Sequence, residues 1–163
     1  MPYSFPGELT RREIISLPLL SMFAGTRHKA FGQEPKKIAA IITEYRRNSH
    51  AEVIIGRLLE GYSYYGNNVV PRVKVVSMYT DRVPDNDISR VKAAQYGVPI
   101  YNTVRDALTL GTNNLAVDGV VLIGEHGNYH WNLKEQHLYP RWWLYMQVID
   151  VSVSYTHLTL PTN

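Results

Sequence analysis

The chain has 163 residues, which is enough for one domain and too few for two of ordinary size. Its 45% hydrophobic and 19% charged residues are typical of a soluble globular protein, and the lack of cysteine excludes disulfides and thiolate metal sites. The net charge of +3 arises mostly before residue 33, so no block of like charge predicts a nucleic-acid partner, and no apolar run is long enough to span a membrane.

Residues 1–32 resemble a twin-arginine export signal. A pair of arginines precedes a modest apolar run, Ile14–Ala24, and basic residues from Arg27 onward follow it. Small residues then stand where a signal peptidase cuts, so we expect a mature chain that begins near Gln33 and is exported to the periplasm. The alternative is an amphipathic helix or the start of an ordinary domain.

Residues 33–152 are predicted to form one partial domain, in which strand and helix signals alternate from residue 37 onward. An isoleucine-rich run, Ile38–Ile42, predicts a buried strand. Ser49 and Glu52 have the spacing of a capping box, which predicts a helix with an apolar stripe that ends at Gly61. The segment "YSYYGNNVVP" that follows is expected to be a loop.

The rest of the domain repeats this alternation. Further strands are predicted at Arg72–Tyr79, Val98–Tyr101 and Asp118–Gly127, and helices at Ile88–Tyr96, Thr103–Leu110 and from Tyr139 to about Val151. This order predicts an α/β fold: a Rossmann-like parallel sheet with helices on both faces, strand order 3-2-1-4, truncated after about four strands.

The end of the chain has a non-biological match. Val153–Thr162 equals, residue for residue, one translated frame of the end sequence used in transposase-based DNA library preparation. We expect residues 153–163 to be adapter-derived, in a truncated metagenomic reading frame of bacterial origin. Tyr155 and His157 are therefore not site candidates.

In a sheet of this kind, ligands bind beyond the carboxyl ends of the strands, where the strand order reverses. Thr43, Glu44 and Tyr45 end or follow the first strand, and Glu125 and His126 follow the fourth. A histidine beside a carboxylate can act as a general base or acid, so Glu125 and His126 are the predicted catalytic pair. The alternative is that both only brace a loop.

Three more residues are expected to face the same crevice. His50 in the first helical turn and Arg46 in the preceding turn are placed to meet an anion. Asp81 follows the second strand, where an acid can bind the ribose hydroxyls of NAD, although a turn-forming aspartate is the alternative. The predicted cofactor-binding residues are thus Thr43, Glu44, Tyr45, Arg46, His50 and Asp81. No metal-binding pattern is present.

Residues 37–132 resemble the N-terminal half-domain of the Gfo/Idh/MocA oxidoreductases. The layout matches in "KIAAIIT", "HAEVIIGRLLEGY" and "VKVVSMYTDR", and the most specific phrases are "YGVPIYNTVRDAL" and "VDGVVLIGEHG". The phrase "IGEHGNY" also resembles an uncharacterised branch of exported bacterial proteins. The resemblance implies an NAD(P)-dependent oxidoreductase acting on a small sugar or polyol, with a homo-oligomer formed through a C-terminal part beyond this chain.

The chain departs from that family at the turn after the first strand. The family's glycine-rich turn is replaced by Thr43–Ser49, and Tyr45 is expected to fill space that a pyrophosphate needs. A second interpretation is therefore a Rossmann-shaped protein without nicotinamide, with a hydrolase, isomerase or metal site built from carboxylates and histidines. A third is a non-catalytic binding protein. Backbone amides around an open space would favour the nicotinamide, and a carboxylate–histidine cluster would favour the second interpretation.

Overall fold

The computed structural model describes residues 34–155. The predicted export signal and residues 156–163 of the predicted adapter-derived tail lie outside the described residues. The elements are β1 (Lys36–Glu44), the π-helical η1 (Glu52–Gly56), α2 (Arg57–Glu60), β2 (Tyr62–Tyr64), β3 (Asn67–Val69), β4 (Val73–Arg82), α3 (Ser89–Tyr96), β5 (Ile100–Tyr101), α4 (Val104–Thr109), β6 (Gly119–Ile123) and α5 (Arg141–Tyr155). Within this part of the chain no helix could cross a membrane.

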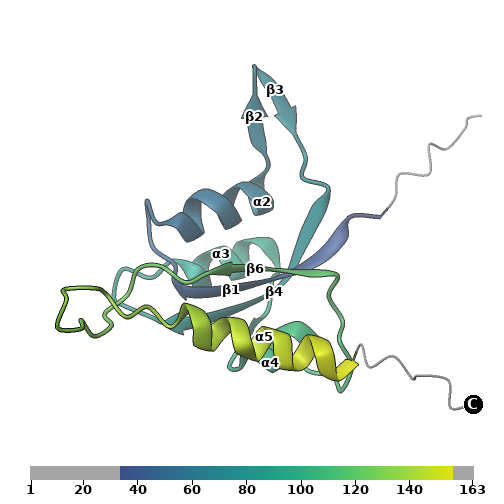
Figure 1. Ribbon diagram of the computed structural model, residues 1–163. Helices are drawn as coiled ribbons and strands as arrows, with labels where there is room; N and C mark the ends of the chain where they lie inside the picture. Colours follow the sequence, from purple (N-terminus) through teal and green to yellow (C-terminus); the bar gives the residue numbers. More distant parts are fainter. Residues whose placement is uncertain (1–33, 156–163) are drawn as a thin grey trace, which may run out of the picture. The chain divides into compact units, whose positions relative to one another are not determined.

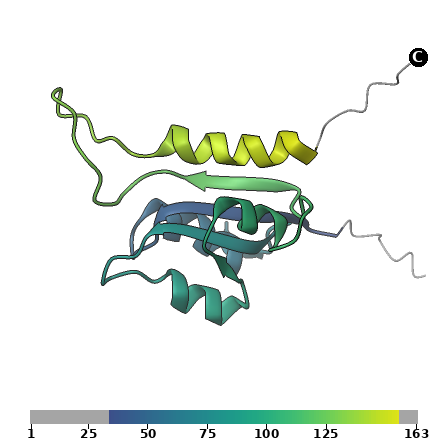
Figure 2. The ribbon, with the colours of Figure 1, turned by 90° about the horizontal axis from the view of Figure 1, so that it is seen from below.

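Four strands form one parallel sheet in the order β5-β4-β1-β6. Counted along the chain, this is the predicted order 3-2-1-4. Figure 1 shows α2 and α3 on one face of the sheet and α4 and α5 on the other, and Figure 2 shows α5 running alongside β6. The predicted Rossmann-like α/β fold is confirmed, and its strand order reverses between β1 and β6.

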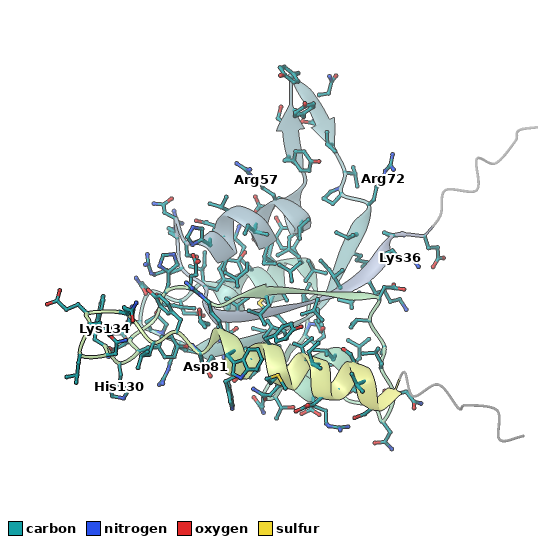
Figure 3. The ribbon with its side chains drawn as sticks, viewed as in Figure 1. Lys36, Arg57, Arg72, Asp81, His130 and Lys134 are labelled. Atoms are coloured by element: carbon teal, nitrogen blue, oxygen red, sulfur yellow. The ribbon has the colours of Figure 1, made fainter. Side chains whose placement is uncertain are left out.

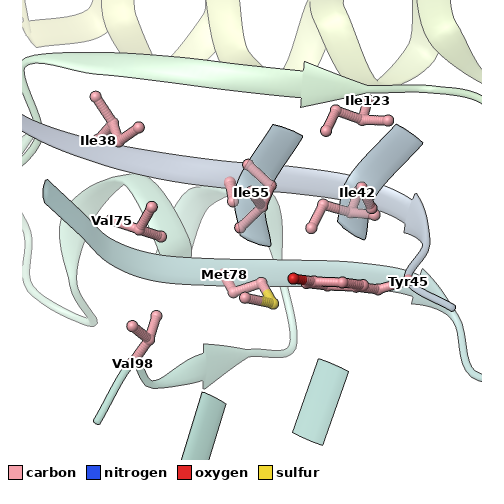
Figure 4. Packing of buried hydrophobic residues seen from close by; sticks show 10 residues of the cluster. Ile38, Ile42, Tyr45, Ile55, Val75, Met78, Val98 and Ile123 are labelled. Atoms are coloured by element: carbon pink, nitrogen blue, oxygen red, sulfur yellow. The ribbon is translucent and has the colours of Figure 1, made fainter. Parts of the chain in front are cut away.

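β1 lies inside the sheet because both of its faces are apolar. Ile38, Ala40 and Ile42 belong to the cluster under η1 and α3 (Figure 4), and Ala39 and Ile41 pack against α4 and α5. Successive side chains of a strand point to opposite faces, so only an unbroken apolar run can be buried on both. The buried strand predicted at Ile38–Ile42 is confirmed.

The first helix differs from the regular helix that we expected. Residues 50–51 are helical, but Glu52–Gly56 is π-helical before α2 continues. The π turns rotate the buried face, because each π bond spans one residue more than an α bond. Ile55 is fully buried, whereas Val53 and Ile54, apolar residues of the same helix, are 46% and 42% exposed.

The predicted capping box is half formed. The hydroxyl of Ser49 accepts a hydrogen bond from the backbone N–H of Glu52 at 3.3 Å. The carboxylate of Glu52 reaches the N–H of Asn48 at 2.6 Å, one residue before the expected partner. Asn48 has a left-handed φ of 59°, which turns its N–H toward the helix start.

The predicted loop after α2 contains a β-hairpin that projects from the sheet (Figure 1). β2 and β3 pair antiparallel through Tyr65 and Gly66, whose φ values of 47° and 78° suit a two-residue type I′ turn. Two of the predicted helix ends are confirmed: Thr103 caps α4 by accepting from the N–H of Asp106 at 3.0 Å, and Gly97 ends α3 with a φ of 64°.

The last helix begins two residues later than predicted and continues to Tyr155. Three residues of the predicted adapter-derived tail are therefore helical. Helical hydrogen bonding propagates easily from a formed helix, and the hydroxyl of Ser154 donates to the carbonyl of Asp150 at 2.5 Å.

Candidate functional site

The carboxyl ends of β1 and β6 open into a crevice beside the long segment that leads from β6 to α5. Figure 3 shows this segment, with His130 and Lys134, at the same end of the sheet as Asp81 and opposite Arg72. This is the end at which the sequence predicts a ligand site, because the strand order reverses there.

Thr43 ties the two strand ends together. Its hydroxyl donates to the carbonyl of Glu125 at 2.5 Å and lies 3.3 Å from the carbonyl of Ile123. The side chain is fully buried. Thr43, a predicted cofactor ligand, therefore positions the backbone of Glu125 and does not line the crevice.

Glu125 lies between two basic side chains. Its Oε2 is 2.7 Å from Nδ1 of His50, and its Oε1 accepts a hydrogen bond from Nη2 of Arg141 at 3.1 Å. At this separation Nδ1 of His50 carries a proton, because a bare nitrogen lone pair would repel the carboxylate. Nε2 of neutral His50 then holds a free lone pair, and within residues 34–155 it makes no hydrogen bond.

His126 is held in an unusual backbone conformation, with a left-handed φ of 68° that costs energy for any residue with a Cβ. Nη2 of Arg46 donates to its Nδ1 at 3.3 Å. A guanidinium only donates, so Nδ1 is the acceptor and the proton of the neutral ring sits on Nε2. Burial lowers the pKa of His126, and the charges of Arg46 and His50 lower it further.

These contacts join into one chain of side chains across the crevice. The rings of His50 and His126 stack with centroids 5.1 Å apart, and Nε of Arg46 donates to Oε1 of Glu44 at 2.7 Å. The chain runs through Glu44, Arg46, His126, His50, Glu125 and Arg141. Five of the eight predicted site residues meet in this cluster, including both predicted catalytic residues.

Tyr45 lies elsewhere, as a correction to its predicted place in the crevice. The side chain is fully buried in the hydrophobic cluster with Ile55 and Met78 (Figure 4). Burial raises the pKa of its hydroxyl, and that oxygen has no hydrogen-bond partner among the described residues. The chain turns after Glu44, and the large ring gains more by leaving water than by standing at the crevice mouth.

Asp81, the predicted ribose ligand, makes its contacts within the protein. Oδ2 accepts a hydrogen bond from the hydroxyl of Tyr129 at 2.6 Å, and Oδ1 accepts one from Tyr79 at 3.0 Å. Burial, followed by the nearby Asp81 charge, raises the pKa of Tyr79 to about 12. Arg82 lies 3.5 Å from Oδ2 and 5.1 Å above the Tyr129 ring. Asp81 thus anchors the segment after β6.

Backbone contacts join the turn after β1 to the segment after β4. The N–H of Ile88 donates to the carbonyl of Tyr45 at 2.9 Å, and Arg46 forms an antiparallel bridge with Asp87. A dinucleotide lies across the strand ends with its pyrophosphate at the first turn. In this protein the backbone of the first turn is engaged by Ile88 and Asp87, and a cavity of about 340 Å³ remains at these strand ends. Its lining residues are Glu44, Asp81, Arg82, Val83, Pro84 and Asn128.

Sequence reasoning missed Arg141 and Tyr129. Arg141 opens α5, and a cation in the first helical turn opposes the helix dipole. A basic residue at such a position signals a specific partner, here Glu125. Tyr129 gave no comparable signal, because its partner Asp81 is 48 residues away.

A cavity of about 370 Å³ opens beside Glu125. Its basic and acidic lining residues are His50, Glu125 and Arg141, and its apolar lining residues are Ile54, Leu122 and Ile123. No group of three or more potential metal ligands occurs within residues 34–155. Because Nε2 of His50 keeps a free lone pair at this cavity, the arrangement can exchange a proton through His50 with a molecule held beside Arg141.

Comparison with known proteins adds no assignment. No family model matches the chain, and no curated protein or solved structure matches it significantly. The resemblance to the Gfo/Idh/MocA oxidoreductases stays a prediction, and functional inference rests on the geometry of the crevice.

Proposed function

We propose that the protein transfers protons to and from a small molecule, as an isomerase or hydrolase does, with His50 as the general base and acid. The observation that carries the proposal is the position of Glu125, which contacts His50 with one carboxylate oxygen and Arg141 with the other, at the edge of a cavity. This corresponds to the carboxylate–histidine alternative of the sequence analysis.

The chemistry follows from the proton positions. Nδ1 of His50 faces the carboxylate of Glu125, so Nε2 is free to take a proton from a substrate. The resulting imidazolium is stabilised by the negative charge of Glu125, and the same proton is then returned to another atom of the substrate or to a leaving group. Positioned acid–base catalysis of this kind contributes roughly 10²- to 10⁴-fold to a rate.

His126 supports the same chemistry through its stack with the His50 ring. Its lowered pKa and its contact with Arg46 keep the ring neutral near pH 7, with a proton on Nε2. Because His126 is neutral, a protonated His50 is not destabilised by a second positive charge in the stack.

The test is proton exchange in deuterated water. NMR would follow the uptake of deuterium into pyruvate and glyceraldehyde, and absorbance would follow hydrolysis of p-nitrophenyl acetate. We expect the protein to accelerate at least one reaction, and His50→Gln to lower that rate about 100-fold or more. His130→Gln, which changes an exposed histidine of the neighbouring segment, should leave the rate unchanged. Equal rates for wild type and His50→Gln would refute the proposal.

The nicotinamide alternative has its own test. The strand order favours a cofactor at the β1 turn, but the placement of Arg46, Asp81 and Ile88 speaks against it. Titration with NADH and NADPH, followed by nucleotide fluorescence, should show no saturable binding up to millimolar concentration. Saturable binding of either would return the oxidoreductase interpretation to first place.

A further inference from the structure

We propose that the crevice selects small organic acids, and that Arg141 binds the substrate carboxylate. The inference rests on the proposed function, because it assigns a substrate class to the same cavity. It departs from the sugar or polyol that the family resemblance implies.

Arg141 is held in place before any ligand arrives. Its Nε donates to the carbonyl of Gly124 at 3.1 Å, its Nη2 donates to Glu125, and its guanidinium lies 5.1 Å from the centre of the Tyr139 ring. A Cβ at position 124 would lie 2.7 Å from Cγ of Arg141, so glycine is needed for this packing. A pre-ordered side chain loses little conformational entropy when it binds a ligand.

The arginine keeps binding capacity that the protein does not use. Nη1 of Arg141 makes no hydrogen bond within the part of the chain that the structure describes, and the side chain is 56% exposed at the cavity. A guanidinium offers five N–H donors in a flat fork that matches the two oxygens of a carboxylate. Nη1 is therefore the nitrogen left to meet a ligand.

The charges around the cavity favour an anion over a neutral ligand. Glu125 is the acidic lining residue and is shared by two basic groups, Arg141 and His50. Arg46, across the histidine stack, is compensated by Glu44. The cavity lining is thus neutral when His50 is neutral and carries one excess positive charge when His50 is protonated, the form that follows proton abstraction.

The apolar lining and the volume of the cavity limit the polarity and the size of the rest of the substrate. Ile54, Leu122 and Ile123 line the cavity with apolar surface and offer no hydroxyl-binding side chains. A cavity of about 370 Å³ is near the lower end for small-molecule sites. A short organic acid fits this cavity better than a polyol does. Its carboxylate would lie at Arg141 and its reacting hydrogen near His50.

The test compares pyruvate with pyruvamide, which has nearly the same shape and no charge. Binding would be measured by NMR titration of the Gly124 and Glu125 amides and the Nε–H of Arg141. We expect wild type to bind pyruvate at least tenfold more tightly than pyruvamide, and Arg141→Gln to remove that preference. Arg141→Lys should keep part of it, because lysine retains the charge without the fork. Arg72→Gln, at the opposite end of the sheet, is the matched control.

Circular dichroism would confirm that each variant is folded, and Arg141→Lys decides the result if Arg141→Gln is not. Equal affinity of wild type for the two ligands, undetectable pyruvate binding at 50-fold excess, or an unchanged preference in both Arg141 variants would overturn the inference. His50→Gln separates it from the proposed function. If that variant still binds pyruvate and wild type shows no exchange chemistry, the carboxylate site stands and the catalytic proposal fails.

Discussion

Asp81 lies at the carboxyl end of β4 and Glu125 follows the carboxyl end of β6, so both stand at the same edge of the sheet, but their roles differ. Both oxygens of Asp81 accept hydrogen bonds from tyrosine hydroxyls, and its side chain is 19% exposed. Glu125 is 42% exposed and meets an imidazole and a guanidinium that each keep a free nitrogen. Both carboxylate oxygens of Asp81 thus have partners within the protein, whereas the two partners of Glu125 each keep a nitrogen that can bind a ligand.

The difference shows how to distinguish a carboxylate that stabilises the fold from one that positions groups for a ligand. A carboxylate whose partners are saturated holds its surroundings together, and losing it costs stability. A carboxylate whose partners still present unused donors or lone pairs positions those groups for a ligand. The same distinction predicts that substitutions at the two residues affect different measurements.

The largest expected effect is on activity, at Glu125. Glu125→Gln removes the charge that orients and stabilises protonated His50, so the exchange rate should fall by about 100-fold. The free energy of unfolding should change by less than about 1 kcal/mol, because the ion pairs are partly exposed. The rate is measured by deuterium uptake and the stability by urea unfolding. Glu135→Gln, an exposed glutamate in the same segment, is the control; a similar loss of rate there would contradict the assignment.

The second effect is on stability, at Asp81. Asp81→Ala leaves the Tyr79 and Tyr129 hydroxyls without their acceptor, and we expect a loss of about 2 kcal/mol in the free energy of unfolding. Tyr129→Phe removes one of the two bonds and should lose about 1 kcal/mol. Urea unfolding measures both. Unaltered stability in Asp81→Ala would remove the distinction between the two carboxylates.

The smallest effect is a pH dependence at His126. The pKa of His126 is lower in the folded protein than its ordinary value of about 6.5, so the unfolded chain binds more protons near that pH. Stability should therefore fall as the pH drops through 6.5. His126→Asn removes the titration and accepts the left-handed φ more easily. Its Tm should fall less between pH 7.5 and pH 5.5 than that of wild type; a parallel fall would show that His126 is not responsible.

Much of the fold follows from local sequence. The isoleucine run of β1 is typical of a strand in the middle of a sheet that helices cover on both faces. Thr103 marks a helix start by its hydrogen bond, and Gly97 marks a helix end by its backbone freedom. The alternation of strands and helices then leaves few topologies, which is why the strand order was predictable. The hairpin also had a local signal, the Tyr65-Gly66 pair, that pattern reasoning passed over.

Sequence by itself determined the fold class and the end of the sheet where Glu125, His126, His50 and Arg46 gather, because periodicity and the direction of parallel strands are local properties. Only the tertiary structure decided the partners. Tyr45 turns into the core, Asp81 pairs with a tyrosine 48 residues away, and Arg141 reaches Glu125 across 16 residues. Such contacts depend on the distances and angles between packed elements, which no spacing along the chain specifies.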